Sequence, residues 1–419
     1  MNPILLSGLP ALSPGQQGIA ELHDAGLWDQ VIEEIDGRRI RVGDHWMTDF
    51  ASCNYLGLDL DPQVQASVGE QIARWGTHPS WSRMLGSPRL YPQLEERLAE
   101  LLGAPDVLTL PTISQIHLSA IPALAGKGGT ILLDSRAHRT IYDGCVYARA
   151  QGATVKRFAS GDLEQAAELL RQAPADQPRL VCMDGVNSMT GNHPDLTAFA
   201  ELCREHGALL YVDDAHGMGV IGERRPDETS PYGARGNAVV KHTGGTYENI
   251  VLVGGLSKSY SSLLAFIACE PAVKRHLKIT CPPYLYSGPV PTASLATAHA
   301  GLDVNAERGD ALRAHLHHLT ARVLDQLDAF GVKTPNESGF PLIEVPLRDP
   351  ALLQPVGRAL LDRGAYVTLA PYPGVPRDEV GFRIQLTAAN TDAEVDALLD
   401  TLKWLHHDFS DAGSPMRPA

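Results

Sequence analysis

A serine and a lysine stand directly behind a pair of glycines near the middle of the chain. The glycines, Gly254-Gly255, end an apolar run, Ile250-Val251-Leu252-Val253, that is typical of a buried parallel strand. Ser257 and Lys258 therefore lie beyond the carboxyl end of that strand, where ligands bind in open α/β sheets. A desolvated lysine amine in such a crevice can act as a nucleophile toward a carbonyl. A Ser-Lys pair alone is more often an ordinary surface feature, so the function of Lys258 has to be judged from the residues predicted to lie near it.

Polar side chains follow four further predicted strands in the same manner. The strands are apolar runs at 107–110, 130–133, 179–183 and 209–212, with helical stretches such as 162–172 and 195–206 between them. The polar pairs beyond them are Thr112 and Ser114, Asp134 and His138, Asp184 and Ser188, and Asp213 and His216. Strands alternating with helices predict an α/β fold with a mainly parallel central sheet. Because the carboxyl ends of parallel strands meet at one edge, we expect these side chains to form one site with Lys258.

The groups expected at this edge match the needs of one cofactor. A lysine that forms a Schiff base needs an aldehyde, and pyridoxal 5'-phosphate (PLP) is the common one. Its ring nitrogen requires a buried carboxylate, its phosphate a helix N-terminus with hydroxyls, and its ring a flat side chain on one face. The expected cofactor contacts are Asp213 at the ring nitrogen, Thr112, Ile113, Ser114 and Ser257 at the phosphate, His138 on the ring face, His216 at the phenolic oxygen, and Ser188 close by.

Each of these assignments has an ordinary structural alternative. Asp213 is also explained as a solvated strand end, Thr112 as a plain helix cap, and His138 as a core histidine. Only the combination with Lys258 favours the cofactor. A serine nucleophile of the Ser-x-x-Lys type is not supported, because Gly255 stands where that serine would be.

Composition excludes several other classes of function. The 419 residues carry a formal net charge of -14, which argues against nucleic-acid binding because phosphate contacts need clustered Lys and Arg. No apolar run is long enough to span a bilayer, and residues 1–14 do not resemble a signal peptide. The six cysteines are dispersed without a Cys-x-x-Cys pair, so we expect reduced thiols in the cytoplasm and no metal site.

The length and the change of pattern along the chain predict two domains. We expect an N-terminal arm and helix at 1–48, a large PLP-binding domain at 49–300, and a smaller C-terminal α/β domain at 301–419. The last helix should begin at the capping-box pattern Thr391-Asp392-Ala393-Glu394. The polar, glycine-containing stretch 222–247 is unusually long for a connection and is predicted to be a mobile flap or an irregular excursion.

Several motifs, taken in chain order, resemble one known family. They are Asn54-Tyr55-Leu56-Gly57-Leu58, Ser82-Arg83 with Leu94-Glu95, Asp134 with His138, Asp184-Gly185-Val186-Asn187-Ser188-Met189-Thr190-Gly191, Asp213-Asp214-Ala215-His216-Gly217, Leu256-Ser257-Lys258, Tyr286-Ser287 and Phe382-Arg383-Ile384-Gln385-Leu386-Thr387-Ala388. Between about Asp49 and Leu402 the chain resembles the α-oxoamine synthases, which are PLP-dependent enzymes of fold type I, with an aspartate-aminotransferase-like fold. The Ser-Met-x-Gly, Asp-x-Ala-His and Leu-Ser-Lys motifs in this order are the specific part of the match.

The resemblance implies an activity and a set of roles. It implies a homodimer with shared active sites that condenses an amino acid with an acyl thioester, loses CO2 and releases an α-amino ketone. Lys258 and His138 would be catalytic, with Lys258 removing the Cα proton of the amino acid. Arg383 would bind the amino-acid carboxylate, a pairing suited to guanidinium, and Asn54 and Arg83 would also bind substrate.

The chain departs from the family pattern at several positions around this site. Cys53 and His117 stand where asparagine is usual, and Gly255 replaces a threonine near the phosphate. Thr112-Ile113-Ser114 replaces a Ser-Gly-aromatic element, and the glycine-rich run before Arg83 is absent. We therefore expect an unusual acyl donor, carried either by CoA or by an acyl carrier protein.

Two other functions remain open from the sequence. An aminotransferase or a C–C lyase would use the same cofactor, lysine and aspartate. A non-catalytic subunit or regulator on this fold would be expected to lose the lysine, whereas Lys258 is present.

Overall fold

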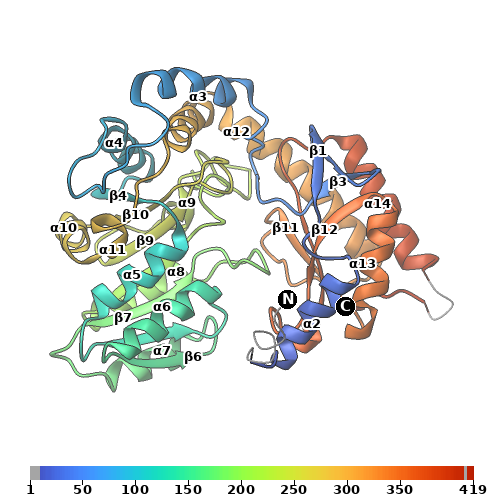
Figure 1. Ribbon diagram of the computed structural model, residues 1–419. Helices are drawn as coiled ribbons and strands as arrows, with labels where there is room; N and C mark the ends of the chain where they lie inside the picture. The colour runs from blue at the N-terminus through green and yellow to red at the C-terminus, as the bar shows by residue number, and fades with distance from the viewer. Residues whose placement is uncertain (1–9, 410–412) are drawn as a thin grey trace.

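The structure is a computed structural model that describes residues 10–409 and 413–419. Its strands form two sheets, and the 38-residue helix α12 (Thr292–Ala329) reaches from one to the other (Figure 1). Within these described ranges, no helix is both long and apolar enough to cross a membrane.

The larger sheet has seven strands and carries the polar strand ends predicted from the sequence. Its spatial order is β4 (Asp106–Leu110), β10 (Ala265–Cys269), β9 (Ile250–Gly255), β8 (Leu209–Asp213), β7 (Arg179–Asp184), β5 (Thr130–Asp134) and β6 (Thr154–Phe158). The strands from β9 to β6 are parallel, while β10 pairs antiparallel with both β9 and β4. Because β10 is antiparallel to both of its neighbours, β4 runs in the same direction as β9 and ends at the same edge as the parallel strands. The predicted mainly parallel sheet is confirmed, and β6 and β10 were not predicted.

Helices cover both faces of this sheet. One apolar cluster joins it to α5 (Ile113–Ala125), α6 (Arg139–Ala150), α10 (Pro271–Thr280) and α11 (Pro282–Leu285). The other cluster joins it to α7 (Leu163–Arg171), α8 (Leu196–Glu205), α9 (Ala238–His242) and α12. Side chains alternate between the faces along each strand, so Tyr211 packs with the α5 cluster while Leu210 and Val212 pack with the other. Asp213 consequently faces α5, like Tyr211.

The smaller sheet joins the two ends of the chain. Its order is β1 (Ile32–Asp36), β2 (Arg39–Val42), β3 (His45–Phe50), β12 (Ala365–Ala370), β13 (Gly381–Gln385) and β11 (Leu342–Pro346). The parallel pairing of β3 with β12 brings residues near 50 beside residues near 366. Helix α13 (Leu353–Asp362) contacts β12, and α14 (Asp392–His407) contacts α12. Short 3-10 turns lie at η1 (Pro350–Leu352) and η2 (Arg377–Glu379). The predicted domain boundary at 48/49 falls within β3, and the one at 300/301 falls within α12. The division into domains stays a prediction.

The remaining helices are α2 (Pro14–Asp24), α3 (Pro62–Trp75) and α4 (Leu90–Leu102). Helix α2 lies within the predicted N-terminal arm and helix at 1–48, and Ser13 and Gln16 form a capping box at its start. Residues 1–9 of that arm lie outside the described residues. At the other end of the chain, the capping box of Thr391 and Glu394 is confirmed.

Of the two predicted alternatives for the stretch 222–247, the structure agrees with the irregular excursion. Tyr232 and Asn237 are buried, and the Tyr232 hydroxyl donates to the carbonyl of Gly339 at 2.7 Å. The buried guanidinium of Arg313, on α12, donates to the carbonyl of Gly219 at 2.9 Å just before this stretch. Side chains thus anchor a segment whose backbone is mostly irregular, which a reading of composition does not reveal.

We predict that Gly144→Ala destabilises the fold. A Cβ at 144, on α6, would lie 2.4 Å from the carbonyl oxygen of His117 on α5, so these two helices would have to separate. The free energy of unfolding should fall by about 1–3 kcal/mol in urea titrations of the apoprotein. Gly69→Ala is the matched control, because a Cβ at that exposed position of α3 has nothing within 4 Å. It should stabilise by up to about 1 kcal/mol. Equal effects of the two substitutions would contradict the close packing of α5 on α6.

Candidate active site

A cavity of about 210 Å³ lies at the carboxyl edge of the larger sheet. It is lined by every residue expected to contact a cofactor: Thr112, Ile113, Ser114, His138, Ser188, Asp213, His216, Ser257 and Lys258. The structure therefore brings these side chains together, while their roles stay a proposal. In the described part of the chain, no group of three or more His, Cys, Asp or Glu side chains could hold a metal ion.

The register of β10 explains how two distant segments reach the same cavity. Ala265 stands opposite Leu110 of β4 on one side and opposite Gly255 of β9 on the other. The two flanking strands therefore end at the same level. Thr112 and Ser257, each two residues beyond its strand, meet at the rim although they are far apart in sequence.

The N-terminus of α5 forms one wall of the cavity. Thr112 is its N-cap and accepts from the backbone N–H of Gln115 at 3.3 Å. The first amides of a helix lack intrahelical partners, and the helix dipole adds positive potential there. Because Ile113 and Ser114 also line the cavity, this wall suits an anion such as phosphate.

Glycine at 255 is explained by the side chain that stands in front of it. A Cβ at 255 would lie 2.6 Å from Cδ1 of Ile113. Ile113 therefore occupies space that a threonine at 255 would need. The departures at 113 and 255 noted from the sequence are thus one coupled change.

Asp213 is the acid at the floor of the cavity. It is 6% exposed, and its Oδ1 accepts from the N–H of Ala215 at 3.0 Å. Its Oδ2 lies 2.9 Å from Nε2 of His117, on α5. Burial alone would raise the pKa of Asp213, but the contact with His117 and the charge of Lys258 hold that pKa below its usual value. The buried carboxyl is thereby kept ionised.

His138 and His216 both line the cavity and follow different strands, β5 and β8. His138 caps α6, and its Nδ1 accepts from the N–H of Thr140 at 3.3 Å, which leaves the proton on Nε2. The backbone N–H of His138 donates to Asp184 at 2.9 Å. Nδ1 of His216 lies 2.7 Å from the hydroxyl of buried Tyr55. Burial, followed by the positive charge of Lys258, lowers the pKa of His216, so its imidazole is neutral.

Tyr55 and His117 were not predicted as site residues. Tyr55 lies within a motif that carries the family resemblance, so that motif was the available signal. His117 was noted only as a departure from a usual asparagine. Its contact with Asp213 depends on the packing of α5 against β8, which no local pattern encodes.

A second cavity of about 810 Å³ shares His138, Ser188, His216 and Lys258 with the first. Its lining also includes residues 372–376, which follow β12, and Arg383 of β13, so segments of both sheets contribute to it. Cys53 also lines it. This cavity gives a larger molecule access to Lys258.

Arg383 reaches this cavity from β13 and is held in place at two points. Its Nη1 donates to the carbonyl of Ser188 at 2.6 Å, and its Nε donates to Oε1 of Gln385 at 3.2 Å. The amide of Gln385 in turn donates to the carbonyl of Ala51 at 2.6 Å and lies 3.6 Å from the sulfur of Cys53. Cys53 is therefore part of the support of Arg383.

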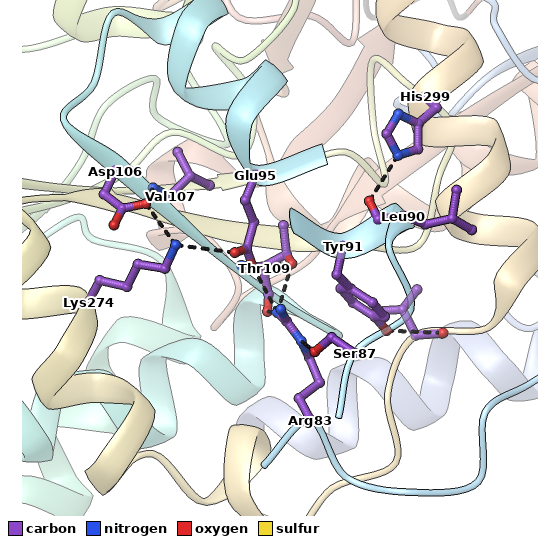
Figure 2. A network of polar contacts seen from close by, with 11 residues as sticks. Arg83, Ser87, Leu90, Tyr91, Glu95, Asp106, Val107, Thr109, Lys274 and His299 are labelled. Atoms are coloured by element: carbon purple, nitrogen blue, oxygen red, sulfur yellow. Dashed lines mark hydrogen bonds and ion pairs between the residues drawn. The ribbon is translucent and has the colours of Figure 1, made fainter. Parts of the chain in front are cut away.

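Arg83 lies outside both cavities, contrary to its expected role in substrate binding. Figure 2 shows its guanidinium in a buried network on β4 and α4. Its Nη1 donates to Glu95 at 2.8 Å and to the carbonyl of Thr109 at 2.8 Å. Lys274 completes the network with a contact of 3.2 Å to Glu95. The guanidinium of Arg83 thus donates to Glu95 and Thr109, and the structure does not bring Arg83 to the cavity that Lys258 lines.

Asn54 also lies outside both cavities. Its Nδ2 donates to Asp59 at 3.1 Å, and its Oδ1 accepts from the hydroxyl of Ser261 at 3.1 Å. Ser261 has a positive φ of 51° only three residues beyond Lys258. Asn54 thus supports the strained loop that carries the lysine rather than facing a ligand.

Comparison with known proteins identifies relatives over nearly the whole chain. The family model for aminotransferase class I and II matches residues 46–402. An 8-amino-7-oxononanoate synthase of Chromohalobacter salexigens is 35% identical over 355 residues, which cover 84% of this chain and 88% of that protein. The synthase of the same name from Pseudomonas putida is 32% identical over 388 residues, covering 92% and 95%.

Solved structures of similar proteins give the same result. A serine palmitoyltransferase from S. paucimobilis with bound PLP and myriocin superposes with a TM-score of 0.84 at 27% identity, covering 94% of this chain and 97% of that one. Serine palmitoyltransferase from Sphingomonas wittichii gives 0.83 at 29% identity with the same coverage.

The network in Figure 2 leads to a stability prediction. Arg83→Met removes the main partner of buried Glu95, so the free energy of unfolding should fall by about 3–5 kcal/mol. Urea unfolding of the apoprotein measures this change. Arg149→Met, at an exposed position on α6, should change little. If Arg83→Met is as stable as that control, the ion pair has no structural role.

Proposed function

The chain belongs to the aminotransferase class I and II family and, within it, to the α-oxoamine synthases, and from this premise we propose how its residues divide the reaction. It is a PLP-dependent acyltransferase that condenses an amino acid with an acyl thioester and releases CO2 to give an α-amino ketone. The relatives are synthases and acyltransferases, which favours this reaction over the aminotransferase or C–C lyase alternative.

The cavity contains what the cofactor requires. Bound PLP supplies an aldehyde that takes up an amine and a cationic ring that withdraws electrons from the Cα of the amino acid. Lys258 and Asp213 line one cavity together with the N-terminus of α5, and this observation carries the assignment. The amides and hydroxyls of Thr112, Ile113 and Ser114, with the hydroxyl of Ser257, would hold the phosphate.

Each side chain around the ring has its own proposed role in cofactor binding and proton transfer. The amine of Lys258 would hold the cofactor and, once free, would take the proton from Cα of the amino acid. Asp213, whose carboxyl stays ionised, would keep the ring nitrogen protonated. His138 would contact the ring, and the neutral His216, which is hydrogen-bonded to Tyr55, would serve the phenolic oxygen. Ser188, which lines both cavities, is proposed as a further contact of the cofactor.

Arg383 is the proposed partner of the amino-acid carboxylate. Its Nη1 and Nε are already engaged with Ser188 and Gln385, so its orientation is fixed before substrate binds. Charge-assisted hydrogen bonds of this kind are strong and directional. Arg83 and Asn54 instead have positioning roles, consistent with their contacts outside the cavities.

The enzyme is proposed to be a homodimer with shared active sites. Large apolar side chains are exposed in the loop before α4, at Trp81, Met84 and Leu85, and Tyr286 is 78% exposed. The N–H of Thr292 donates to the carbonyl of Thr77 at 3.1 Å, so the two segments lie close together. Apolar surface of this kind is typical of subunit contacts.

The donor and the compartment complete the proposal. The larger cavity would receive the acyl thioester, carried by CoA or by an acyl carrier protein. The six cysteines are free thiols, five of them buried. We therefore place the enzyme in the cytoplasm, where thiols stay reduced.

The reaction itself is tested with purified holoenzyme, a panel of amino acids, and acyl groups on either CoA or a carrier protein. We expect equal amounts of CO2 and α-amino ketone with one pairing. Lys258→Ala should abolish the product and the covalent retention of PLP after borohydride treatment. Lys403→Ala, at an exposed lysine on α14, is the matched control and should behave as wild type. An active Lys258→Ala enzyme would contradict the mechanism, and pyridoxamine phosphate formed from an amino acid alone would indicate transamination.

Arg383→Lys tests the carboxylate contact. Lysine keeps the charge but loses the planar pair of donors. We expect the KM for the amino acid to rise about 10- to 100-fold, with a smaller change in kcat. The KM for the acyl donor should stay constant, as should both constants in the control Arg204→Lys on α8. An unchanged KM for the amino acid would place its carboxylate elsewhere.

A further inference from the structure

Three buried polar side chains form a continuous chain behind the cavity. The hydroxyl of Tyr211 lies 2.9 Å from Nδ1 of His117, and Nε2 of the same ring lies 2.9 Å from Oδ2 of Asp213. Tyr211 and His117 are 0% exposed, and Asp213 is 6% exposed at the cavity floor. The chain thus leads from the core to the carboxylate that faces the ligand.

The arrangement follows from the fold. Tyr211 and Asp213 are two residues apart on β8, so both side chains point to the face covered by α5. His117 lies one turn into α5 and places its imidazole edge between them, with the Tyr211 ring 5.7 Å away and inclined by 64°. Apolar side chains and thiols such as Ile116, Cys145 and Cys182 surround the group and keep water out.

Proton counting assigns the direction of both hydrogen bonds. Burial raises the pKa of Tyr211 well above its usual value, so its hydroxyl keeps its proton. That hydroxyl has no other bonding partner among the described residues and must donate to Nδ1 of His117. The imidazole proton then lies on Nε2 and is donated to Asp213. In this state a neutral imidazole satisfies every polar atom of the chain.

We propose that Tyr211 and His117 are positioning residues that hold Asp213 ionised and correctly oriented, and thereby set the protonation of the cofactor's ring nitrogen. This inference rests on the proposed function and deepens it. Tyr211 fixes the tautomer of His117, and His117 fixes the carboxylate. Besides Nε2 of His117 at Oδ2, the carboxylate of Asp213 accepts from the backbone N–H of Ala215 at Oδ1.

The histidine at 117 is what makes such a chain possible. A carboxylate with few donors in a buried place tends to take up a proton. An asparagine at 117 could donate to Asp213, but it has no aromatic nitrogen that accepts from Tyr211. Its shorter side chain would therefore leave the tyrosine hydroxyl buried without a partner. The departure at 117 and the tyrosine at 211 are accordingly one unit.

The test uses holoenzyme loaded with PLP labelled with 15N at the ring nitrogen. Tyr211→Phe removes only the hydroxyl, and His117→Leu removes both hydrogen bonds. Tyr260→Phe is the matched control, because the buried hydroxyl of Tyr260 has no hydrogen-bond partner in the described residues. The 15N resonance reports protonation directly, and the dissociation constant of PLP is measured alongside, with melting temperatures of the apoproteins.

The expected results form a graded series. The wild-type resonance should lie at the protonated position, shift partly toward the unprotonated position in Tyr211→Phe, and shift further in His117→Leu. The dissociation constant of PLP should rise about 3- to 10-fold in Tyr211→Phe and about 10- to 100-fold in His117→Leu. Tyr260→Phe should change neither quantity.

Other outcomes overturn the inference. Wild-type resonances in both variants would show that His117 and Tyr211 serve packing alone, even if the melting temperature falls. If His117→Leu does not fold, Tyr211→Phe decides by itself. A wild-type chain that takes up no PLP overturns the proposed function as well, whereas unshifted variants of an active holoenzyme overturn only the positioning role.

Discussion

A negative charge placed where little water reaches it is the constraint on which this site depends. Asp213 bears that charge, and burial alone would neutralise it. The imidazole of His117 and the amine of Lys258 offset that tendency. The neighbouring carboxyls behave oppositely: burial raises the pKa of Asp214 to about 7, and burial together with the charge on Asp213 raises that of Asp184. Of three neighbouring acids, one thus has its pKa lowered and two have theirs raised, and only their environments distinguish them.

The geometry of the larger sheet converts this electrostatic arrangement into a binding site. An antiparallel strand, β10, separates β4 from β9, yet both end at the same level because they pair with the same residue, Ala265. The N-terminus of α5 and the amine of Lys258 thereby line one cavity. The smaller sheet adds Arg383 to the wider cavity, so the residues proposed for the cofactor and the residue proposed for the substrate carboxylate come from different sheets.

What the sequence could predict depended on whether the signal was local. Strand ends followed by polar residues predicted the convergence of Asp213 and Lys258, because strand direction alone decides it. The strand at 154–158 was missed, since it lies at the sheet edge, is partly exposed and lacks a continuous apolar run. Arg83 was misplaced, because a motif does not show which way a guanidinium points. His117 needed the contact between α5 and β8, which is purely tertiary.

The strands of the two sheets are distributed very differently along the chain. The seven strands of the larger sheet all lie within residues 106–269, whereas β3, at 45–50, needs β12 at 365–370 as its neighbour. Synthesis proceeds from the N-terminus, and domains generally fold as units during it. All strands of the larger sheet can therefore be synthesised before β12, the strand that pairs with β3, leaves the ribosome. Ile32 and Ile35 of β1 are exposed to the solvent even in the complete fold. The residues that line the smaller cavity, from Thr112 to Lys258, are therefore all synthesised before Arg383, the residue proposed to receive the substrate.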